Sequence, residues 1–225
     1  MGYFTDDFSQ FFMDLAGNNN TEWFHANKER YDKSVKAPFE AFVEKLIDEI
    51  SKLDPEYQIT PKECIFRLHR DVRFSKDKST YKLFSSAVIS PKGRKEKSIP
   101  GLFLKLSPED MWIMGGCYNP TTVQLKKIRT AISSYPKAFR ALIERPDFKN
   151  KFGELKGEVN KRIPLEFQEV FKIEPLIARK QFYYGTDLSP ETIIDNNLVS
   201  LVMNHWKSMR PVSDFLTEAI TEDGV

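Results

Sequence analysis

The stretch Gly101-Leu-Phe-Leu-Lys-Leu-Ser-Pro-Glu-Asp-Met-Trp-Ile-Met-Gly-Gly-Cys117 determines the fold class of this chain. Its two short apolar runs, Gly101–Leu106 and Met111–Cys117, flank a Ser-Pro-Glu-Asp sequence that is typical of a turn. A connection this short cannot contain the crossover helix that joins two parallel strands. The stretch therefore predicts an antiparallel pair of strands at the centre of the fold.

The same strand signal extends outward in both directions along the chain. Ile65–Val72 and Leu83–Ser90 are rich in β-branched, aromatic and aliphatic residues, and Ser-Pro-Lys-Gly follows the second of them. Arg179–Tyr184 has the same character near the C-terminal end of the chain. These segments predict further strands of one antiparallel sheet.

Helical periodicity precedes the sheet. Phe8, Phe11, Phe12 and Leu15 follow the spacing of one helix face, and Gly17 is a fitting helix stop. Asn19, with Glu22 three residues on, predicts the start of a second helix by a capping box. A third helix is predicted from about Pro38 to Leu53, and these residues form its apolar stripe: Phe39, Phe42, Val43, Leu46, Ile47 and Ile50.

Helices are predicted again after Pro120, beginning at Thr121, at Pro136, at Leu165 and at Ser189-Pro190. The last of these is long, and Pro211 is expected to break or kink it. Helices before and after a central antiparallel sheet are typical of the α+β class. We expect a single α+β domain over residues 1–225, with the sheet covered by N-terminal and C-terminal helices.

Composition excludes several classes of protein. The 225 residues carry 34 Lys and Arg, 32 Asp and Glu and 29 aromatic side chains, with a net charge of +2. Disordered chains lack so many aromatics, and bulk nucleic-acid binders are more basic. Two cysteines cannot form a disulfide-rich scaffold. The acidic N-terminus is unlike a signal peptide, and no apolar run has the length of a membrane helix. We expect a cytoplasmic protein that does not bind a membrane.

The small net charge hides a strong asymmetry. Residues 62–105 contain twelve Lys and Arg but only four Asp and Glu, a net charge of +8, so the rest of the chain carries −6. Six of the basic residues fall within Arg67–Lys82. If Ile65–Asp71 is a strand, Phe66, Leu68, Arg70 and Val72 share one face, and Arg67, His69, Asp71 and Arg73 share the other.

Several guanidinium groups close together repel one another unless water, carboxylates or an anionic ligand compensate them. Three interpretations stay open: a solvated strand face with Arg–Asp pairs, a site for a phosphate or carboxylate ligand, and a contact surface for a macromolecule. The loop Phe74–Thr80 has small and polar residues that are suited to present backbone N–H groups to an anion. The candidate ligand-binding residues are Arg67, His69, Arg70, Asp71, Arg73, Lys78, Tyr81 and Lys82.

At these residues the chain resembles the DUF2461 family of conserved uncharacterised proteins. Arg70-Asp-Val-Arg-Phe-Ser-Lys-Asp-Lys-Ser-Thr-Tyr-Lys82 is similar to the signature of that family. The resemblance covers about residues 4–210 and rests on further positions: Phe11, Leu15, Asn18, Asn19, Trp23, Phe24, Asn27, Tyr31, Met114–Pro120, Leu125, Ile128, Arg129, Lys161–Pro164 and Lys180. Thr80 stands where proline is expected, and Cys117 stands where glycine is common. The resemblance implies a single intracellular domain and no particular activity.

Other constellations give little chemistry. His25, His69 and His205 lack the spacing of zinc ligands, so no metal site is expected, and neither a catalytic residue nor a cofactor can be named. Gly115-Gly116 predicts a strand turn or a close backbone approach rather than a phosphate loop.

The leading hypothesis is therefore a protein that binds an anionic small molecule. It includes the possibility of an enzyme that acts on a phosphorylated small molecule, although whether the chain is an enzyme is left open. The alternative is an interaction module for an acidic protein or, less expected, for a nucleic-acid backbone. The sequence says nothing of the oligomeric state.

Overall fold

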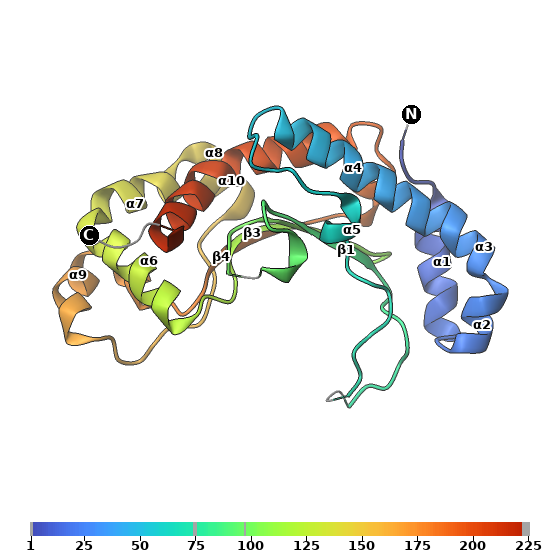
Figure 1. Cartoon of the computed structure of the whole chain (residues 1–225), viewed down its shortest axis with the longest axis horizontal. Coiled ribbons are helices and arrows are strands. Elements are labelled where there is room, and N and C mark those ends of the chain that lie inside the picture. The colour runs from blue at the N-terminus through green and yellow to red at the C-terminus, as the bar shows by residue number, and fades with distance from the viewer. Residues whose placement is uncertain (1, 74–75, 97, 222–225) are drawn as a thin grey trace. The chain divides into compact units, whose positions relative to one another are not determined.

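The structure is a computed structural model that describes residues 2–73, 76–96 and 98–221. It has the predicted α+β fold, with helices before and after a four-stranded antiparallel sheet (Figure 1). The strands are β1 (Ser85–Ile89), β2 (Leu102–Leu106), β3 (Met111–Cys117) and β4 (Phe182–Leu188), in the order β1-β2-β3-β4. Strand β3 has the bounds that the sequence predicts.

The central hairpin of β2 and β3 has one buried face. Residues of β2 and β3 alternate strictly between buried and half-buried side chains, as a strand with one covered face requires. Lys105 and Trp112 lie on the half-buried face, where the Lys105 ammonium is 4.2 Å from the Trp112 ring centroid. Ser107 closes the turn, because its N–H donates to the carbonyl of Asp110 at 3.0 Å.

Irregular segments extend the sheet beyond its outer strands. On the outer side of β1, the Phe66 N–H donates to the Ser86 carbonyl at 2.9 Å. On the outer side of β4, the Lys156 N–H donates to the Tyr183 carbonyl at 2.6 Å. The two outer strands therefore have hydrogen-bonded neighbours that are too short or too irregular to form full strands.

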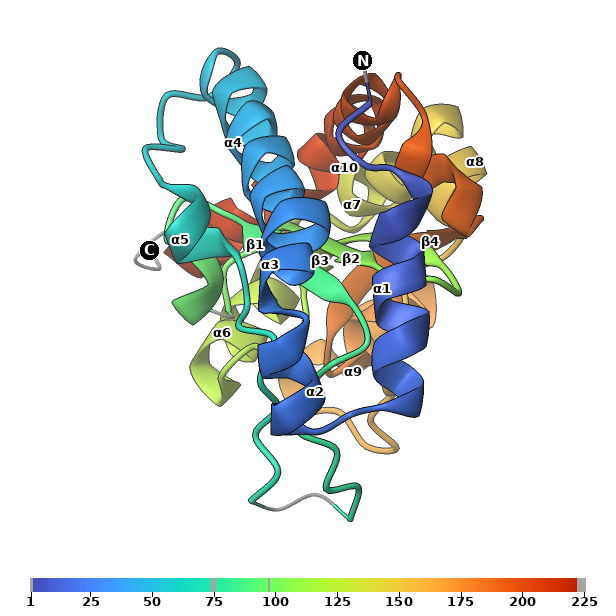
Figure 2. The same ribbon diagram turned by 90° about the vertical axis from the view of Figure 1, so that its right-hand side faces the viewer.

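The N-terminal helices are α1 (Asp6–Gly17), α2 (Thr21–Ala26), α3 (Lys28–Tyr31), the π-helix η1 (Asp32–Lys36) and α4 (Ala37–Ser51). Figure 2 shows α1 beside α3 and α4. The six apolar residues predicted for the stripe of α4 are all buried. The predicted cap of α2 is wrong by one residue, because the Asn20 side chain accepts the hydrogen bond from the Trp23 N–H at 2.9 Å.

After α4 come α5 (Pro61–Cys64) and the 3-10 turn η2 (Gly93–Lys95). The C-terminal part contains α6 (Thr122–Ser134), α7 (Pro136–Glu144), α8 (Pro146–Phe152), η3 (Leu165–Phe167), α9 (Gln168–Ile173), η4 (Pro175–Ala178), η5 (Pro190–Ile194) and α10 (Leu198–Thr221). Thr121 caps α6 and Pro136 begins α7, as the sequence predicts.

The predicted start of the last helix is wrong. Ser189-Pro190 begins only a 3-10 turn, because an intervening Asp-Asn-Asn sequence separates that turn from α10. Of the break or kink expected at Pro211, the break does not occur, since α10 continues through this residue. After Pro211, α10 buries Val212, Leu216, Ala219 and Ile220, and such packing can hold a proline-containing helix together.

The chain divides into two compact units. The first comprises residues 1–94, 103–113 and 187–203, and the second comprises residues 95–102, 114–186 and 204–225. The expectation of a single domain over residues 1–225 stays a prediction. Residues 2–73, 76–84 and the N-terminal helices all belong to the first unit, so the basic residues of interest can be described within it.

Gly115 and Gly116 allow β3 to lie close to its neighbours in the second unit. Gly116 has φ +92°, and a Cβ there would overlap the Phe182 carbonyl oxygen and lie 2.9 Å from the Tyr183 Cα. A Cβ on Gly115 would lie 2.9 Å from the Tyr184 ring. The predicted close backbone approach is confirmed, because only glycine fits here without strain.

We expect Gly116→Ala to destabilise the protein by about 1 to 3 kcal/mol from the positive φ alone, with the overlap adding to this cost. Urea denaturation measures the change. Gly17→Ala is the matched control, because a Cβ there meets nothing within 4 Å. This control should be neutral or stabilising by up to about 1 kcal/mol. Equal stabilities of the two variants would contradict the explanation.

Candidate functional site

Residues 65–73 and 76–84 lie on an extended excursion of the chain, and we call 65–84 the basic arm (Figure 1). The prediction of a regular strand over Ile65–Val72 is wrong. Phe66 bonds Ser86 and Leu68 bonds Lys82, so one residue on the first side of the arm faces three residues on the second. This bulge at Leu83 and Phe84 interrupts the ladder of hydrogen bonds, and only isolated bridges remain.

The arm nevertheless has the two faces that alternation predicts. Phe66, Leu68, Arg70 and Val72 are half-buried, whereas the residues between them are exposed: Arg67, His69, Asp71 and Arg73. Extended backbone alone produces this alternation, with or without a regular ladder. Phe74 and Ser75, which belong to the loop predicted to bind an anion, lie outside the described residues.

Two predicted arginines in the outer part of the arm are bound by carboxylates of the arm itself. Arg73 donates to Asp71 from Nε at 2.9 Å and from Nη2 at 2.6 Å. Hydrogen bonds from Arg73 lower the pKa of Asp71 to about 2. Asp77 accepts from the Ser79 N–H at 2.9 Å and from Arg70, and these bonds, the backbone one first, lower its pKa to about 2.

Lys78 also finds a partner within the arm, because its ammonium donates to the Val72 carbonyl at 2.9 Å. The arm therefore satisfies three of the predicted cationic side chains with its own oxygens. A set of cations already bonded in this way is typical of a structural network rather than of a ligand cradle.

Tyr81 is a structural residue. Its side chain is buried, and its ring is stacked on Phe24 of α2 at a centroid distance of 4.3 Å. The His69 ring lies 4.5 Å away on the other strand of the arm. The Asn19 side chain accepts from the Tyr81 N–H at 2.8 Å and donates to its carbonyl at 3.0 Å. Tyr81 and Asn19 therefore attach the arm to the N-terminal helices.

Arg67 and Lys82, at the base of the arm, differ from the other predicted residues. Lys82 is half-buried, with its ammonium 5.3 Å from the Phe66 ring centroid and 5.8 Å from that of Phe84. Burial lowers the pKa of Lys82, and the charge of Arg67 lowers it further. Neither cation forms an ion pair with a described residue, since Asp71, which also senses the charge of Arg67, is bonded to Arg73.

The positive charge of Lys105, in contrast, is neutralised by a carboxylate. Lys105 lies 5.4 Å from the Phe84 ring centroid, and its Nζ is 2.7 Å from the Asp110 carboxylate. Lys82 lies over the same ring without such a partner among the described residues. Of the predicted site residues, Arg67 and Lys82 are thus the cations with neither a carboxylate nor a carbonyl partner among the described residues.

A cavity of about 30 Å³ lies beside the base of the arm. These residues line it: Tyr31, Lys36, Phe39, Glu40, Ile65, Phe66, Leu68, Phe84 and Ser85. The volume corresponds to about one water molecule. Neither Arg67 nor Lys82 lines this cavity, so the proposed contacts of these two cations lie outside it.

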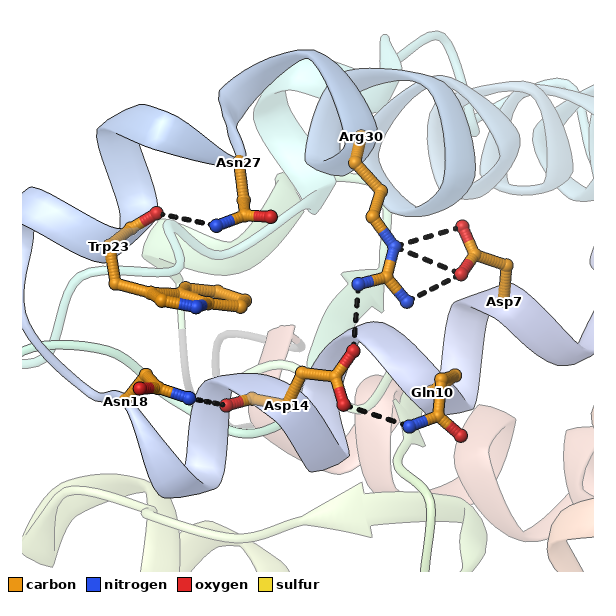
Figure 3. Close-up of polar contacts among 7 residues, drawn as sticks. All are labelled: Asp7, Gln10, Asp14, Asn18, Trp23, Asn27 and Arg30. Atoms are coloured by element: carbon orange, nitrogen blue, oxygen red, sulfur yellow. Dashed lines mark hydrogen bonds and ion pairs between the residues drawn. The ribbon is translucent and has the colours of Figure 1, made fainter.

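Sequence reasoning missed a polar cluster between α1 and α3 (Figure 3). Arg30 donates from Nε to Asp7 at 2.9 Å and from Nη1 to Asp14 at 2.7 Å, and Gln10 donates to Asp14 at 2.8 Å. Hydrogen bonds from Arg30 lower the pKa of both carboxyl groups and raise that of Arg30 itself. The seven-residue spacing of Asp7 and Asp14 places them on one helix face, which is the signal that the sequence offered.

A family model described as "Conserved hypothetical protein (DUF2461)" matches residues 7–215. The chain belongs to this family. A comparison with curated proteins finds no match. Two stretches that carry the resemblance to DUF2461 are in direct contact, because Asn19 of the opening stretch bonds Tyr81 of the basic signature. The resemblance thus covers both sides of the attachment of the arm.

The described part of the chain lacks two further features. No helix there is long and apolar enough to cross a membrane. Within the same residues, no three side chains of His, Cys, Asp and Glu are grouped so that they could hold a metal ion.

We expect Asn19→Ala to detach the arm from the N-terminal helices. The variant leaves the Tyr81 N–H and carbonyl without their partner, which costs about 1 to 3 kcal/mol. Hydrogen exchange of the Tyr81 amide should become faster. Asn18→Ala is the matched control, because the Asn18 side chain donates to the Asp14 carbonyl of the preceding helix. An unchanged Tyr81 amide in Asn19→Ala would contradict the assignment.

The Arg30 cluster predicts a pH dependence of stability. The folded pKa values of Asp7 and Asp14 lie below their ordinary values, so the unfolded state binds more protons as the pH falls. The stabilisation is complete above the ordinary carboxyl range and is lost below about pH 4. Arg30→Gln should be less stable at neutral pH and lose less stability on acidification.

Urea denaturation between neutral and acidic pH measures this difference. Arg145→Gln is the control, because it removes an exposed ion pair with Asp147. Its stability should follow that of the unaltered protein at every pH. Parallel curves for Arg30→Gln and the unaltered protein would rule out a role of Arg30 in the pH dependence.

Proposed function

We propose that this protein binds an anionic group, a phosphate or a carboxylate, on Arg67 and Lys82 at the base of the basic arm. The observation that supports the proposal is the pair of neighbouring cations without a carboxylate partner among the described residues. Arg70 and Arg73 are bonded to aspartates, and Lys105 is bonded to Asp110. A bound anion would neutralise the charges of Arg67 and Lys82, as these carboxylates neutralise the charges of the other cations.

The energetics favour an anion at this position. A half-buried ammonium loses part of its hydration, and a second cation nearby adds repulsion. A bound phosphate or carboxylate reverses both effects, because it favours the charged form of Lys82. Arg67 contributes a planar donor fork that matches either oxyanion.

The attachment of the arm to the N-terminal helices also supports the proposal. Asn19 and Phe24 hold Tyr81, the residue next to Lys82, against the N-terminal helices. A ligand that binds there does not have to order the base of the arm, which lowers the entropic cost of binding. In this view Tyr81 and His69 are positioning residues and not ligand contacts.

A second candidate function follows from the exposed outer part of the arm. Arg73 and Lys76 are exposed there. The arm carries six Lys and Arg and two Asp, a net charge of +4. An acidic protein segment could lay several carboxylates along such a surface, and a nucleic-acid backbone could do so with phosphates. The carrier of the anionic group is thus a small molecule or an extended partner.

The proposal also extends to an enzymatic role and to a cytoplasmic location. An enzyme that acts on a phosphorylated small molecule would use the same anion site. A cytoplasmic location is supported by Cys64 and Cys117, which are free and buried, as is usual in a reducing compartment. Burial raises the pKa of each thiol to about 12, so both are unreactive at neutral pH.

We expect inorganic phosphate to raise the melting temperature of the protein. At a hundredfold excess over the dissociation constant, the gain is about 2.7 kcal/mol. Arg67→Gln and Lys82→Gln should each weaken phosphate binding by about 1.5 to 3 kcal/mol, the range for a hydrogen bond to a charged group. Lys137→Gln, which removes an exposed charge on α7, should bind phosphate as the unaltered protein does.

The carrier is identified by comparing three probes at low and high salt: phosphate, an oligoglutamate peptide and a single-stranded oligonucleotide. Tight binding of one long probe, together with weakening by Arg73→Gln and Lys76→Gln, would support an extended partner. A steep salt dependence would identify the nucleic-acid version. If none of the probes binds, or if Lys137→Gln weakens binding as much as Arg67→Gln, the proposed site is wrong.

A further inference from the structure

The cavity beside the base of the basic arm has apolar walls that are interrupted by polar side chains. Phenylalanine rings from α4 and from the arm line it: Phe39, Phe66 and Phe84. Its polar lining comes from α3, η1, α4 and β1: Tyr31, Lys36, Glu40 and Ser85. None of these four side chains forms a hydrogen bond or an ion pair with another described residue. The cavity thus collects polar groups whose bonding capacity is not used within the described part of the chain.

Lys36 and Glu40 do not form the ion pair that their spacing allows. Residues four apart lie on the same side of a helix, and both of these side chains are exposed. Two other lysine–acid pairs of the N-terminal helices have the same spacing and the same order of charges, and both are ion paired: Lys28–Asp32 and Lys45–Glu49. Spacing and orientation therefore do not explain why the pair at the cavity stays open. Its two charges are available to a ligand.

The Tyr31 phenol is a hydrogen-bond donor in the same cavity. Burial, followed by the charges of Asp32 and Glu40, raises the pKa of Tyr31 to about 12, so the phenol keeps its proton at neutral pH. The effect of Glu40 also indicates that its carboxylate lies near the phenol. The cavity therefore presents an ammonium, a carboxylate and a hydroxyl donor beside apolar walls, which is the composition of a small-molecule site.

We propose that this cavity binds a free α-amino acid with a small side chain, such as alanine or serine. The Lys36 ammonium binds its carboxylate, the Glu40 carboxylate binds its ammonium, and its side chain packs against the Phe66 ring. The inference goes beyond the proposed function, because neither Arg67 nor Lys82 lines the cavity.

The volume and the charges of the cavity select this class of ligand. A cavity of about 30 Å³ accepts a methyl or hydroxymethyl group, whereas the side chain of leucine is too large. A simple carboxylate would be attracted by Lys36 but repelled by Glu40, and a simple amine would be attracted by Glu40 but repelled by Lys36. A zwitterion pairs with both side chains and adds no net charge to the site.

Isothermal titration calorimetry of the intact protein with alanine tests the proposal. Alanine and serine should bind, whereas propionate and ethylamine, which each lack one of the two charges, should bind about tenfold more weakly. Leucine should bind more weakly than alanine, because its side chain does not fit. Lys36→Gln and Glu40→Gln should each weaken alanine binding by about tenfold, since a hydrogen bond to a charged group is lost.

Lys45→Gln and Glu49→Gln are the matched controls, because they open an ion pair of the same spacing on α4 that does not line the cavity. Both variants, and Arg67→Gln, should bind alanine as the unaltered protein does. If alanine does not bind, or if propionate or leucine binds as tightly as alanine, the inference is wrong, and the proposed function still stands on its phosphate test. Weakening by Arg67→Gln without weakening by Lys36→Gln would assign alanine to the proposed anion site and would also overturn the inference.

Discussion

The two hydrogen bonds between the Asn19 side chain and the backbone of Tyr81 are the constraint on which the candidate site depends. They join a turn between two N-terminal helices to an arm 62 residues further along the chain. The ladder of the arm is interrupted at Leu83 and Phe84, so its own hydrogen bonds hold it only in part. Stacking of Tyr81 on Phe24 adds apolar contact at the same point. The position of Lys82 follows directly from this attachment.

The electrostatics of the arm follow from how few carboxylates it contains. Its two aspartates are each bonded to one arginine, so the charges of Arg70 and Arg73 are neutralised within the arm. Arg67 and Lys82 are left over at the base, where Lys82 is partly removed from water. The near-neutral net charge of the chain conceals this local excess. The candidate site is therefore marked by the lack of a carboxylate partner for Arg67 and Lys82 among the described residues, and not by the number of cations.

Local features of the fold could be predicted from the sequence, whereas contacts between distant segments could not. The bounds of β3, the stripe of α4 and the close approach at Gly116 all follow from neighbouring residues. The alternating exposure of the arm was predicted for the same reason. Arg30 meets Asp7 and Asp14 only after two helices pack together, and Asn19 was interpreted as a helix cap because its partner lies far along the chain. Resemblance to DUF2461 marked Asn19 without explaining it.

The irregular segments beside β1 and β4 have a consequence for the behaviour of the protein in solution. A strand at the edge of a sheet exposes N–H and carbonyl groups that can pair with another molecule and begin aggregation. Here Phe66 bonds the outer side of β1, and Lys156 bonds the outer side of β4. Both neighbours are short and soon leave the ladder, so they cover an edge without becoming a regular edge themselves. The bulge that shapes the base of the arm thereby also protects the sheet from self-association.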